Sequence, residues 1–153
     1  IGIRGRMTGL VGGHAKNFGT NVVFADEARI MSPREMADQI IEVVGDGPTY
    51  ISLDLDCLDP VFNSASSAVE PFGLDANWIY DVLKLVRMSG KVNLVGADVV
   101  EYAPQNDPAR TFGYIAAGLS WKILCWLAAD VKRRNGGVNH PTVWDMALGN
   151  VTL

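Results

Sequence analysis

The sequence predicts an α/β fold, with three layers (α/β/α) around a mainly parallel sheet, and two observations lead to this prediction. Short apolar segments rich in β-branched residues alternate along the chain with helical segments that are apolar on one face. One of these segments, residues 50–54, is almost continuously apolar, which is typical of a parallel strand covered on both faces. The candidate strands make a modest sheet, which suggests part of a larger one.

Four segments have the composition of strands. They are residues 1–4, 21–25, 50–54 and 92–100. A helix is expected between the second and the third. Its N-terminus carries a capping box, in which Ser32 precedes Pro33 and Glu35, and Gly45 or Gly47 would end it.

Two further helices are expected after aspartates that would act as caps. One follows Asp75 and ends at Gly90, and a longer one opens at Asp107 and Pro108. Helical spacing predicts which side chains of the three helices point inward. These are Met36, Ile40, Val43 and Val44 in the first, Ile79, Val82, Leu83 and Val86 in the second, and Phe112, Ile115, Leu119, Ile123, Trp126 and Leu127 in the third.

The chain has 153 residues, the length of about one domain. We assign residues 1–134 to that domain and residues 135–153, which are rich in Gly and Asn, to a tail for the surface or for oligomer contacts. Residues 1–4 begin as a strand already under way, so we expect the chain to be part of a longer protein.

The composition of the chain limits the kinds of partner and compartment that we expect. The formal net charge is −4 and the basic residues form no stripe, so nucleic acid and membrane surfaces are not expected. No continuous apolar stretch reaches about 18 residues, so no membrane-spanning helix is expected. Cys57 and Cys125 have no metal-binding spacing. We therefore expect a reducing compartment, the cytoplasm or, in a eukaryote, the mitochondrial matrix.

Acidic residues gather where two of the predicted strands end. Asp54 and Asp56 are two positions apart, so in a strand they would point the same way, at the edge where open α/β sheets place ligands. Because unpaired carboxylates are costly to bury, a divalent cation such as Mg²⁺ or Mn²⁺ is an apt partner. Ion pairs or turn caps would explain this pair of aspartates equally well. Asp98 and Glu101 stand at the second strand end.

Other polar residues are predicted to have structural roles. Asp59 precedes Pro60 and is expected to shape a turn. Cys57 has no histidine near it in the sequence and is expected to be a packed thiol. His14 and His140 are expected on the surface.

The segment S-L-D-L-D-C-L-D-P, residues 52–60, resembles a metal signature of the ureohydrolases, the arginase–agmatinase family, which usually reads S-F-D-x-D-x-x-D-P. I-G-I-R-G, A-D-E-A-R, V-E-P-F-G-L and V-G-A-D-V-V-E-Y-A-P-Q-N-D are also similar to agmatinase-like members, in the same order and spacing. The resemblance spans residues 1 to about 130.

The resemblance implies a hydrolase with an arginase-like fold, of which this chain would form the C-terminal part. In the family, two Mn²⁺ ions activate a water that attacks a guanidinium carbon and releases urea, and Ni²⁺ is an alternative metal. Asp54 would bridge the two ions, Asp56 would bind one, and Glu101 would contact the guanidinium of the substrate. No catalytic residue beyond the metal ligands is assigned. A homo-oligomer, trimeric or hexameric, is implied as well.

Two departures from the family pattern bear on function. The signatures G-G-D-H and D-A-H-x-D are absent, so the segment is expected to supply part of the binuclear site and to be inactive alone. The loop that usually reads G-T-G-T-P-E-P-G-G is A-S-S-A-V-E-P-F-G at residues 65–73, which changes backbone freedom beside the pocket. Two alternatives to an agmatinase-like amidinohydrolase stay open: a hydrolase of free or substituted guanidine, and a non-catalytic partner subunit of a ureohydrolase complex.

Overall fold

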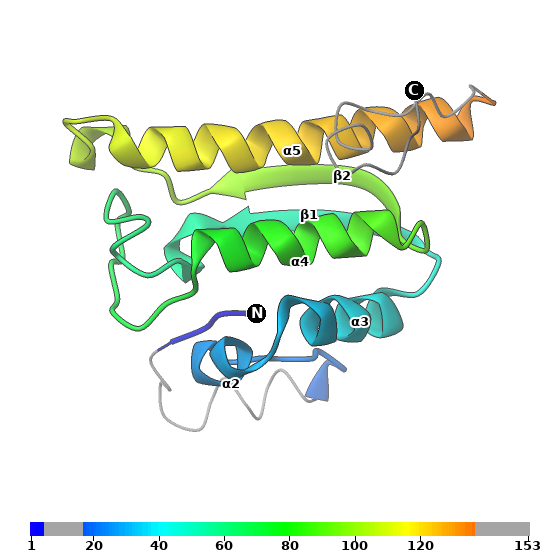
Figure 1. Cartoon of the computed structure of the whole chain (residues 1–153), viewed down its shortest axis with the longest axis horizontal. Helices are drawn as coiled ribbons and strands as arrows, with labels where there is room; N and C mark the ends of the chain where they lie inside the picture. Colours follow the sequence, from blue (N-terminus) through cyan, green and yellow to red (C-terminus); the bar gives the residue numbers. More distant parts are fainter. Residues whose placement is uncertain (5–16, 137–153) are drawn as a thin grey trace.

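A computed structural model describes residues 1–4 and 17–136, and its elements confirm the α/β class (Figure 1). In chain order they are α2 (Ala25–Ile30), α3 (Pro33–Val44), β1 (Pro48–Asp54), the 3-10 helix η1 (Leu55–Cys57), α4 (Ala76–Met88), β2 (Asn93–Val100), the 3-10 helix η2 (Pro104–Asn106) and α5 (Thr111–Arg134). His14, His140 and most of the expected tail lie outside the described residues, so the predictions made for them stay predictions.

The sheet of the described chain consists of β1 and β2, which run parallel, with α4 as the crossover between them. The register places Pro48 opposite Asn93 and Asp54 opposite Val100. Because the strands are parallel and in this register, both end at the same edge of the sheet. Glu101, the residue directly after β2, therefore follows the strand end that lies beside Asp54.

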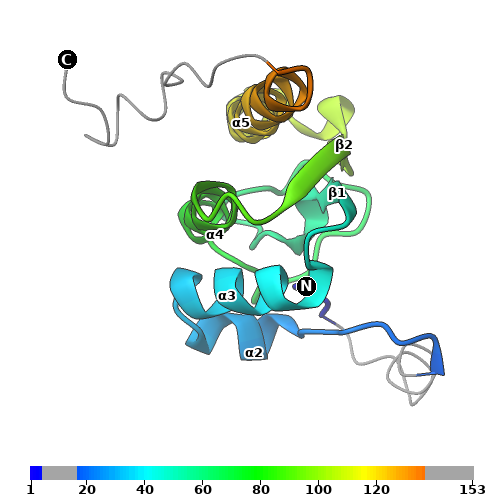
Figure 2. The ribbon, with the colours of Figure 1, turned by 90° about the vertical axis from the view of Figure 1, so that its right-hand side faces the viewer.

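One face of the sheet packs against the helices. Leu53 of β1 and Leu94 of β2 are buried in a core that also contains Val82 of α4 and Leu119 of α5. In both views α4 lies between α5 and α3, and α2 lies beside α3 (Figures 1 and 2). The helices thus form a layer on the buried side of the two strands.

The opposite face of the sheet is exposed within the described residues. Tyr50 and Ser52 of β1 point to this side, and both donate hydrogen bonds to Asp98 of β2, at 3.1 and 2.7 Å. Two-sided coverage, expected from the apolar run at 50–54, is therefore not present in the described part of the chain.

The predicted strand at residues 21–25 is wrong except for a single bridge, in which Phe24 pairs with Ile3 in parallel. Ala25 already begins α2. The reason is local: the side chain of Glu27 accepts a hydrogen bond from the Phe24 amide at 2.9 Å, which caps a helix start. The β-branched content of the segment was outweighed by this acidic first turn.

Helix α3 starts as predicted, with Ser32 as N-cap and Gly45 as C-cap. Met36 is fully buried, as expected. Val43, predicted to point inward, is 52% exposed. The difference arises because α3 packs mainly on α4, which leaves the edge of its apolar face uncovered within the described residues.

Ser32→Ala is expected to lower the free energy of unfolding of the complete protein by about 1 kcal/mol, because it removes an N-cap oxygen. The hydroxyl accepts from the Glu35 amide, and the Glu35 carboxylate accepts from the Ser32 amide and hydroxyl. These hydrogen bonds lower the pKa of Glu35. The carboxylate's contribution is therefore complete above its unfolded pKa and is lost as the pH falls through its folded pKa. Urea denaturation at pH 7 and at acidic pH tests both statements, and Ser32→Thr, which keeps the oxygen, should change stability less.

Helix α5 begins at Thr111, after the predicted start at Asp107. Arg110 precedes it in the left-handed backbone region, with φ of 56°. Asp107 still caps the helix from outside, because its carboxylate accepts from the Gly113 amide at 2.8 Å and from the Tyr102 hydroxyl at 3.0 Å. Asp107 is therefore a buried capping residue, but it is not the N-cap position.

Among the described residues, α5 is the one helix that is long and apolar enough to cross a membrane by length and composition. Lys122 interrupts the apolar run of this helix, and a core helix meets the same criterion, so the expectation that no helix spans a membrane stays a prediction. In the structure one face of α5 packs in the core through Leu119, Ile123 and Trp126.

Candidate metal and substrate site

The strand end at Asp54 changes direction earlier than the sequence pattern predicts. β1 stops at Asp54, and Asp56 lies in the 3-10 helix η1. The alternation of strand side chains therefore does not extend to Asp56. The two aspartates are linked instead by the turn, in which the Asp54 carboxylate accepts a hydrogen bond from the Asp56 amide at 3.0 Å. The turn orients the Asp54 side chain at the edge of the sheet.

Negative charge is concentrated at this edge. The pKa of Asp56 is raised above its usual value, first by burial and then by the negative charge of Asp54, with a smaller contribution in the same direction from Glu101. Arg4 acts in the opposite direction. Three carboxylates thus interact electrostatically although they come from η1, β1 and the loop after β2. A bound cation would relieve this mutual repulsion.

Arg4 also lies at this edge, although no sequence motif singled it out. Its guanidinium Nη2 donates to the backbone carbonyl of Asp56, and Nη1 donates to the carbonyl of Gly2 at 3.4 Å. Arg4 therefore connects the first segment of the chain to η1. Arg4 ends a predicted strand, as Asp54 does, and this position in the sequence could have marked it as a residue of the edge.

Glu101 stands directly after β2 with φ of 60°, in the left-handed region that few residues other than Gly and Asn occupy. Its Oε2 accepts hydrogen bonds from the hydroxyls of Ser67 at 2.5 Å and Ser66 at 3.5 Å. Phe72 and Arg110 are the other described residues besides glycines with positive φ. All three lie in loops after η1 and β2, and such strain is most often retained at functional sites.

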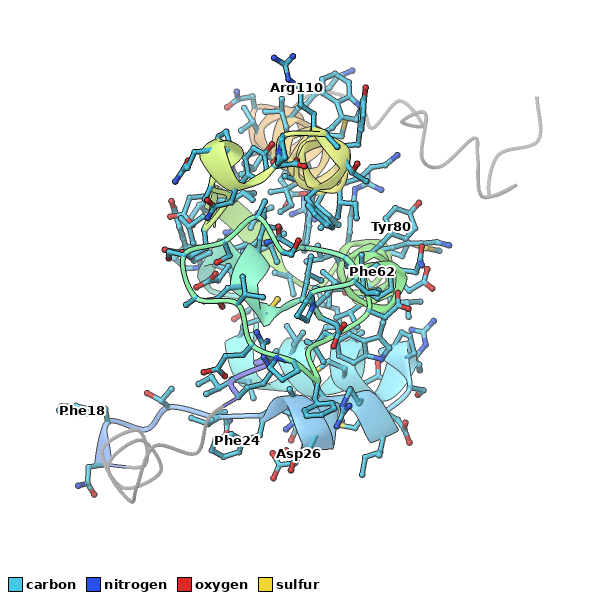
Figure 3. All side chains as sticks on the ribbon, turned by 90° about the vertical axis from the view of Figure 1, so that its left-hand side faces the viewer. Phe18, Phe24, Asp26, Phe62, Tyr80 and Arg110 are labelled. Carbon is cyan, nitrogen blue, oxygen red and sulfur yellow. The ribbon has the colours of Figure 1, made fainter. Side chains whose placement is uncertain are left out.

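Figure 3 faces the side of the molecule on which the strands end, where the long loop after η1, marked by Phe62, and the start of α5, marked by Arg110, both lie. The two loops are joined here by main-chain and side-chain hydrogen bonds. The Ala103 amide donates to the Ala65 carbonyl at 2.7 Å. The edge thus carries carboxylates from two strand ends, and hydrogen bonds join the loop after η1 to the loop after β2.

Asp98, the other acid of the second strand, does not belong to this group. It lies opposite Ser52 in the register, on the exposed sheet face, and its carboxylate accepts from Tyr50 and Ser52. Because the sequence shows only that Asp98 is near a strand end, its distance from the edge could be read only from the strand register.

The turn role predicted for Asp59 is confirmed. Its carboxylate accepts from the backbone amides of Val61 at 3.2 Å and Gly73 at 3.1 Å. Gly73 must remain glycine, because a Cβ there would lie 2.4 Å from the backbone of Leu58 and Asp59. Asp59 therefore closes the loop that follows η1.

Cys57 is a packed thiol, as predicted. It is buried, and burial together with the charge of Asp54 raises its pKa to about 11. The thiol is therefore protonated near neutral pH, which makes it a poor nucleophile. Cys125 is likewise free of a disulfide.

A cavity of about 330 Å³ lies along β1, between α3 and α4. Its lining is largely apolar and includes Val23, Ile51, Leu53 and Val82, with Asp54 at one end. An apolar cavity of this kind does not match a hydrophilic cation. The carboxylate edge is the better candidate for polar chemistry.

The donor set at the edge fits a hard divalent cation only in part. Asp54 and Asp56 offer carboxylate oxygens, the ligands preferred by Mg²⁺ and Mn²⁺. Within residues 1–4 and 17–136, no group of three or more His, Cys, Asp or Glu side chains is arranged to hold a metal ion. Two carboxylates are fewer than the roughly six ligands that such a cation takes.

Comparison with known sequences identifies relatives over most of the chain. The family model described as the Arginase family matches residues 1–125, a range that contains Asp54, Asp56 and Glu101. An agmatinase from Photorhabdus laumondii subsp. laumondii is 36% identical over 120 residues, which cover 78% of this chain and 38% of that protein. The chain therefore spans less than half the length of this relative.

Solved structures give the same result. Proclavaminate amidino hydrolase from Streptomyces clavuligerus is similar with a TM-score of 0.76 and 31% identity, over 85% of this chain and 42% of that one. A hypothetical agmatinase from Burkholderia thailandensis has a TM-score of 0.71 and 31% identity, over 88% and 38% of the respective chains. The parallel sheet with its helices is thus part of the fold that these proteins share.

Proposed function

The chain belongs to the arginase family, and on that premise we propose that the complete protein hydrolyses a small guanidino compound to urea and an amine. The observation that carries this proposal is the gathering of Asp54, Asp56 and Glu101 at one edge of a parallel sheet. In the reaction water adds its oxygen to the guanidinium carbon, one carbon–nitrogen bond breaks, and the amine leaves with a proton.

We assign a pair of Mn²⁺ ions, or Ni²⁺ in their place, to this edge, held in part by Asp54 and Asp56. The assignment rests on the chemistry of the donors, two neighbouring hard carboxylates, of which Asp56 has its pKa raised by burial and by the negative charge of Asp54. When bound, such ions act as Lewis acids and lower the pKa of a water molecule, which makes water a competent nucleophile near neutral pH.

The chain's own residues would bind and orient the substrate and the metal ligands. Glu101 would accept charge-assisted hydrogen bonds from the cationic guanidinium, which places the carbon to be attacked. Asp54 is oriented by the Asp56 amide, and Arg4 anchors η1 through the Asp56 carbonyl. These contacts position both carboxylates before any ligand arrives.

We also propose that this chain supplies only part of the metal site. Asp54 and Asp56 are too few to complete the coordination of two divalent ions, and the matched relative is more than twice as long as the aligned region. The remaining ligands would come from residues outside this chain. Residues 1–153 by themselves are accordingly expected to be inactive.

Two observations bear on the substrate within the guanidino class. One structural neighbour carries the name proclavaminate amidino hydrolase and another that of a hypothetical agmatinase, so the names found within this fold cover more than one amidine substrate. In this chain Ser66 and Ser67 lie against Glu101 in a loop where the family motif has Thr and Gly. That difference favours free or substituted guanidine as the second candidate substrate.

A non-catalytic partner subunit is the alternative from another class. The presence of Asp54, Asp56 and Glu101 at one edge supports the enzyme over this alternative. Carboxylates that repel one another are costly to keep together without a cation, so a subunit that binds no metal would gain nothing from them.

The test is metal analysis and urea release by the complete protein, with agmatine, arginine, free guanidine and methylguanidine as substrates. Bound Mn²⁺ together with urea from at least one compound would support the enzyme. A folded protein that binds no Mn²⁺ or Ni²⁺ and releases no urea would instead favour the partner subunit. We also propose that the complete protein is a homo-oligomer, trimeric or hexameric, as the family resemblance implies, and sedimentation of the same sample tests this.

A further inference from the structure

The segment of residues 65–68 holds the carboxylate of Glu101. Ser67 donates its hydroxyl hydrogen to Glu101 Oε2 at 2.5 Å, and Ser66 lies 3.5 Å from the same oxygen. We propose that Ser67 is a positioning residue for Glu101, which fixes one carboxylate oxygen so that the other faces the substrate cation. The inference rests on the proposed function, in which Glu101 contacts the guanidinium.

The hydroxyl of Ser67 comes from a segment that is itself held firmly. Ala65 and Ser66 are buried, and Ser66 accepts the Ala68 amide through its hydroxyl at 3.3 Å. The Ala65 carbonyl accepts from the Ala103 amide at 2.7 Å, and the Ser66 carbonyl accepts from the Asn106 side chain at 3.0 Å. Together with the contacts of the Ser66 and Ser67 hydroxyls with Glu101, four hydrogen bonds therefore join this segment to residues 101–106, the chain after β2.

Both ends of the Ser67–Glu101 contact are thus fixed by backbone. Glu101 has the left-handed φ of 60° directly after β2, and Ser67 follows a buried residue in a clamped loop. A glutamate side chain has three rotatable bonds and would otherwise sample many orientations in solvent. Within the described residues the hydrogen bonds to this carboxylate are all on Oε2, so Oε1 keeps its lone pairs for an incoming cation.

The hydroxyl is specific to this chain's version of the loop. In the family motif, the position of Ser67 is a glycine, which has no side chain to donate. Holding Glu101 in this way orients it before the substrate binds, and such preorganisation strengthens binding by reducing the freedom that is lost on association.

The experiment is Ser67→Ala in the complete, Mn²⁺-loaded protein. We expect KM for agmatine, or for the compound of the panel that releases most urea, to rise about threefold to tenfold, with kcat changed less than about twofold, as for a lost hydrogen bond to a charged group. The Kd of guanidinium ion, measured with dilute guanidinium chloride, should rise by the same factor. Metal content should not change.

Two variants separate this role from a structural one. Ser67→Thr keeps the hydroxyl and should restore KM to near the original value. Ser120→Ala removes a hydroxyl that bonds to the Ala116 carbonyl within α5, far along the chain from the loop, and should leave KM unchanged.

The double variant with Glu101→Ala tests whether Ser67 acts through Glu101, because alanine, unlike glutamine, cannot accept the hydrogen bond of Ser67. If it does, Ser67→Ala should have little further effect once the side chain of residue 101 is gone. If Ser67→Ala raises KM by the same factor with and without the Glu101 side chain, the inference is overturned. It is also overturned if Ser67→Ala leaves KM unchanged while Glu101→Gln is impaired. The proposed function would survive either result. Unimpaired Glu101→Gln, or an unmodified protein that neither binds guanidinium nor releases urea, would instead reject the proposed substrate contact, and the inference with it.

Discussion

Replacing Asp54 with Asn in the complete protein is expected to empty at least one metal position and to lower urea release by about 100-fold or more, since even indirect partners of metal ligands cost 10–100-fold when removed. A carboxylate that bridges two cations offers two charged oxygens, and the amide offers one neutral oxygen. The amide can still accept the Asp56 amide hydrogen bond that orients residue 54, so the local turn should persist. Elemental analysis and urea assays of the purified variant measure the two effects.

Two neighbouring substitutions make the comparison informative, because each also replaces one aspartate by asparagine in the same short stretch. Asp56→Asn should affect one cation more than the other, since only one is expected to contact it. Asp59→Asn should leave metal content near normal, because its side chain accepts from the amides of Val61 and Gly73 and closes the loop. An ion pair or turn role for Asp54 predicts loss of stability without loss of metal. Full metal content and undiminished urea release in Asp54→Asn would reject the assignment.

The edge at which Asp54 and Glu101 lie could be predicted because it depends on a regular feature of parallel sheets. Strands that run in one direction end at one edge, so a run of aspartates after an apolar strand marks that edge whatever the details of the turn. The structure places Asp54 opposite Val100 and Glu101 next along the chain, as that rule requires. Metal binding itself stays a prediction.

The turn after Asp54 could not be predicted from side-chain alternation. The rule of period two holds only while the backbone is extended, and the Asp54 carboxylate caps a 3-10 helix that includes Asp56. The same kind of local hydrogen bond moved the start of α5, because Asp107 reaches the Gly113 amide from outside the helix. In both places a short polar side chain competed with the regular pattern.

Contacts between loops could not be predicted from the sequence, for a different reason. Ser67 and Glu101 are separated by 34 residues and meet only because the parallel register brings the loops after η1 and β2 together. The glycine-poor loop indicated altered backbone freedom, and Phe72 indeed occupies the left-handed region with φ of 65° where the family motif has Gly. The sequence could not indicate that the new serines would bind the carboxylate of Glu101.

Glu101→Gln is expected to lower kcat/KM of the complete protein by about ten- to a hundredfold while metal content stays unchanged. Glutamine keeps the shape of the side chain but removes the charge that faces the guanidinium, and a hydrogen bond to a charged group contributes about 1.5–3 kcal/mol. Glutamine can also still accept from Ser67, so a loss in kcat/KM would report the missing charge more than a displaced side chain. Glu42→Gln, the same chemical change on the exposed side of α3, is the matched control and should have no effect. If Glu101→Gln and the control behave alike, Glu101 does not contact the substrate, and its hydrogen bonds with Ser66 and Ser67 are structural.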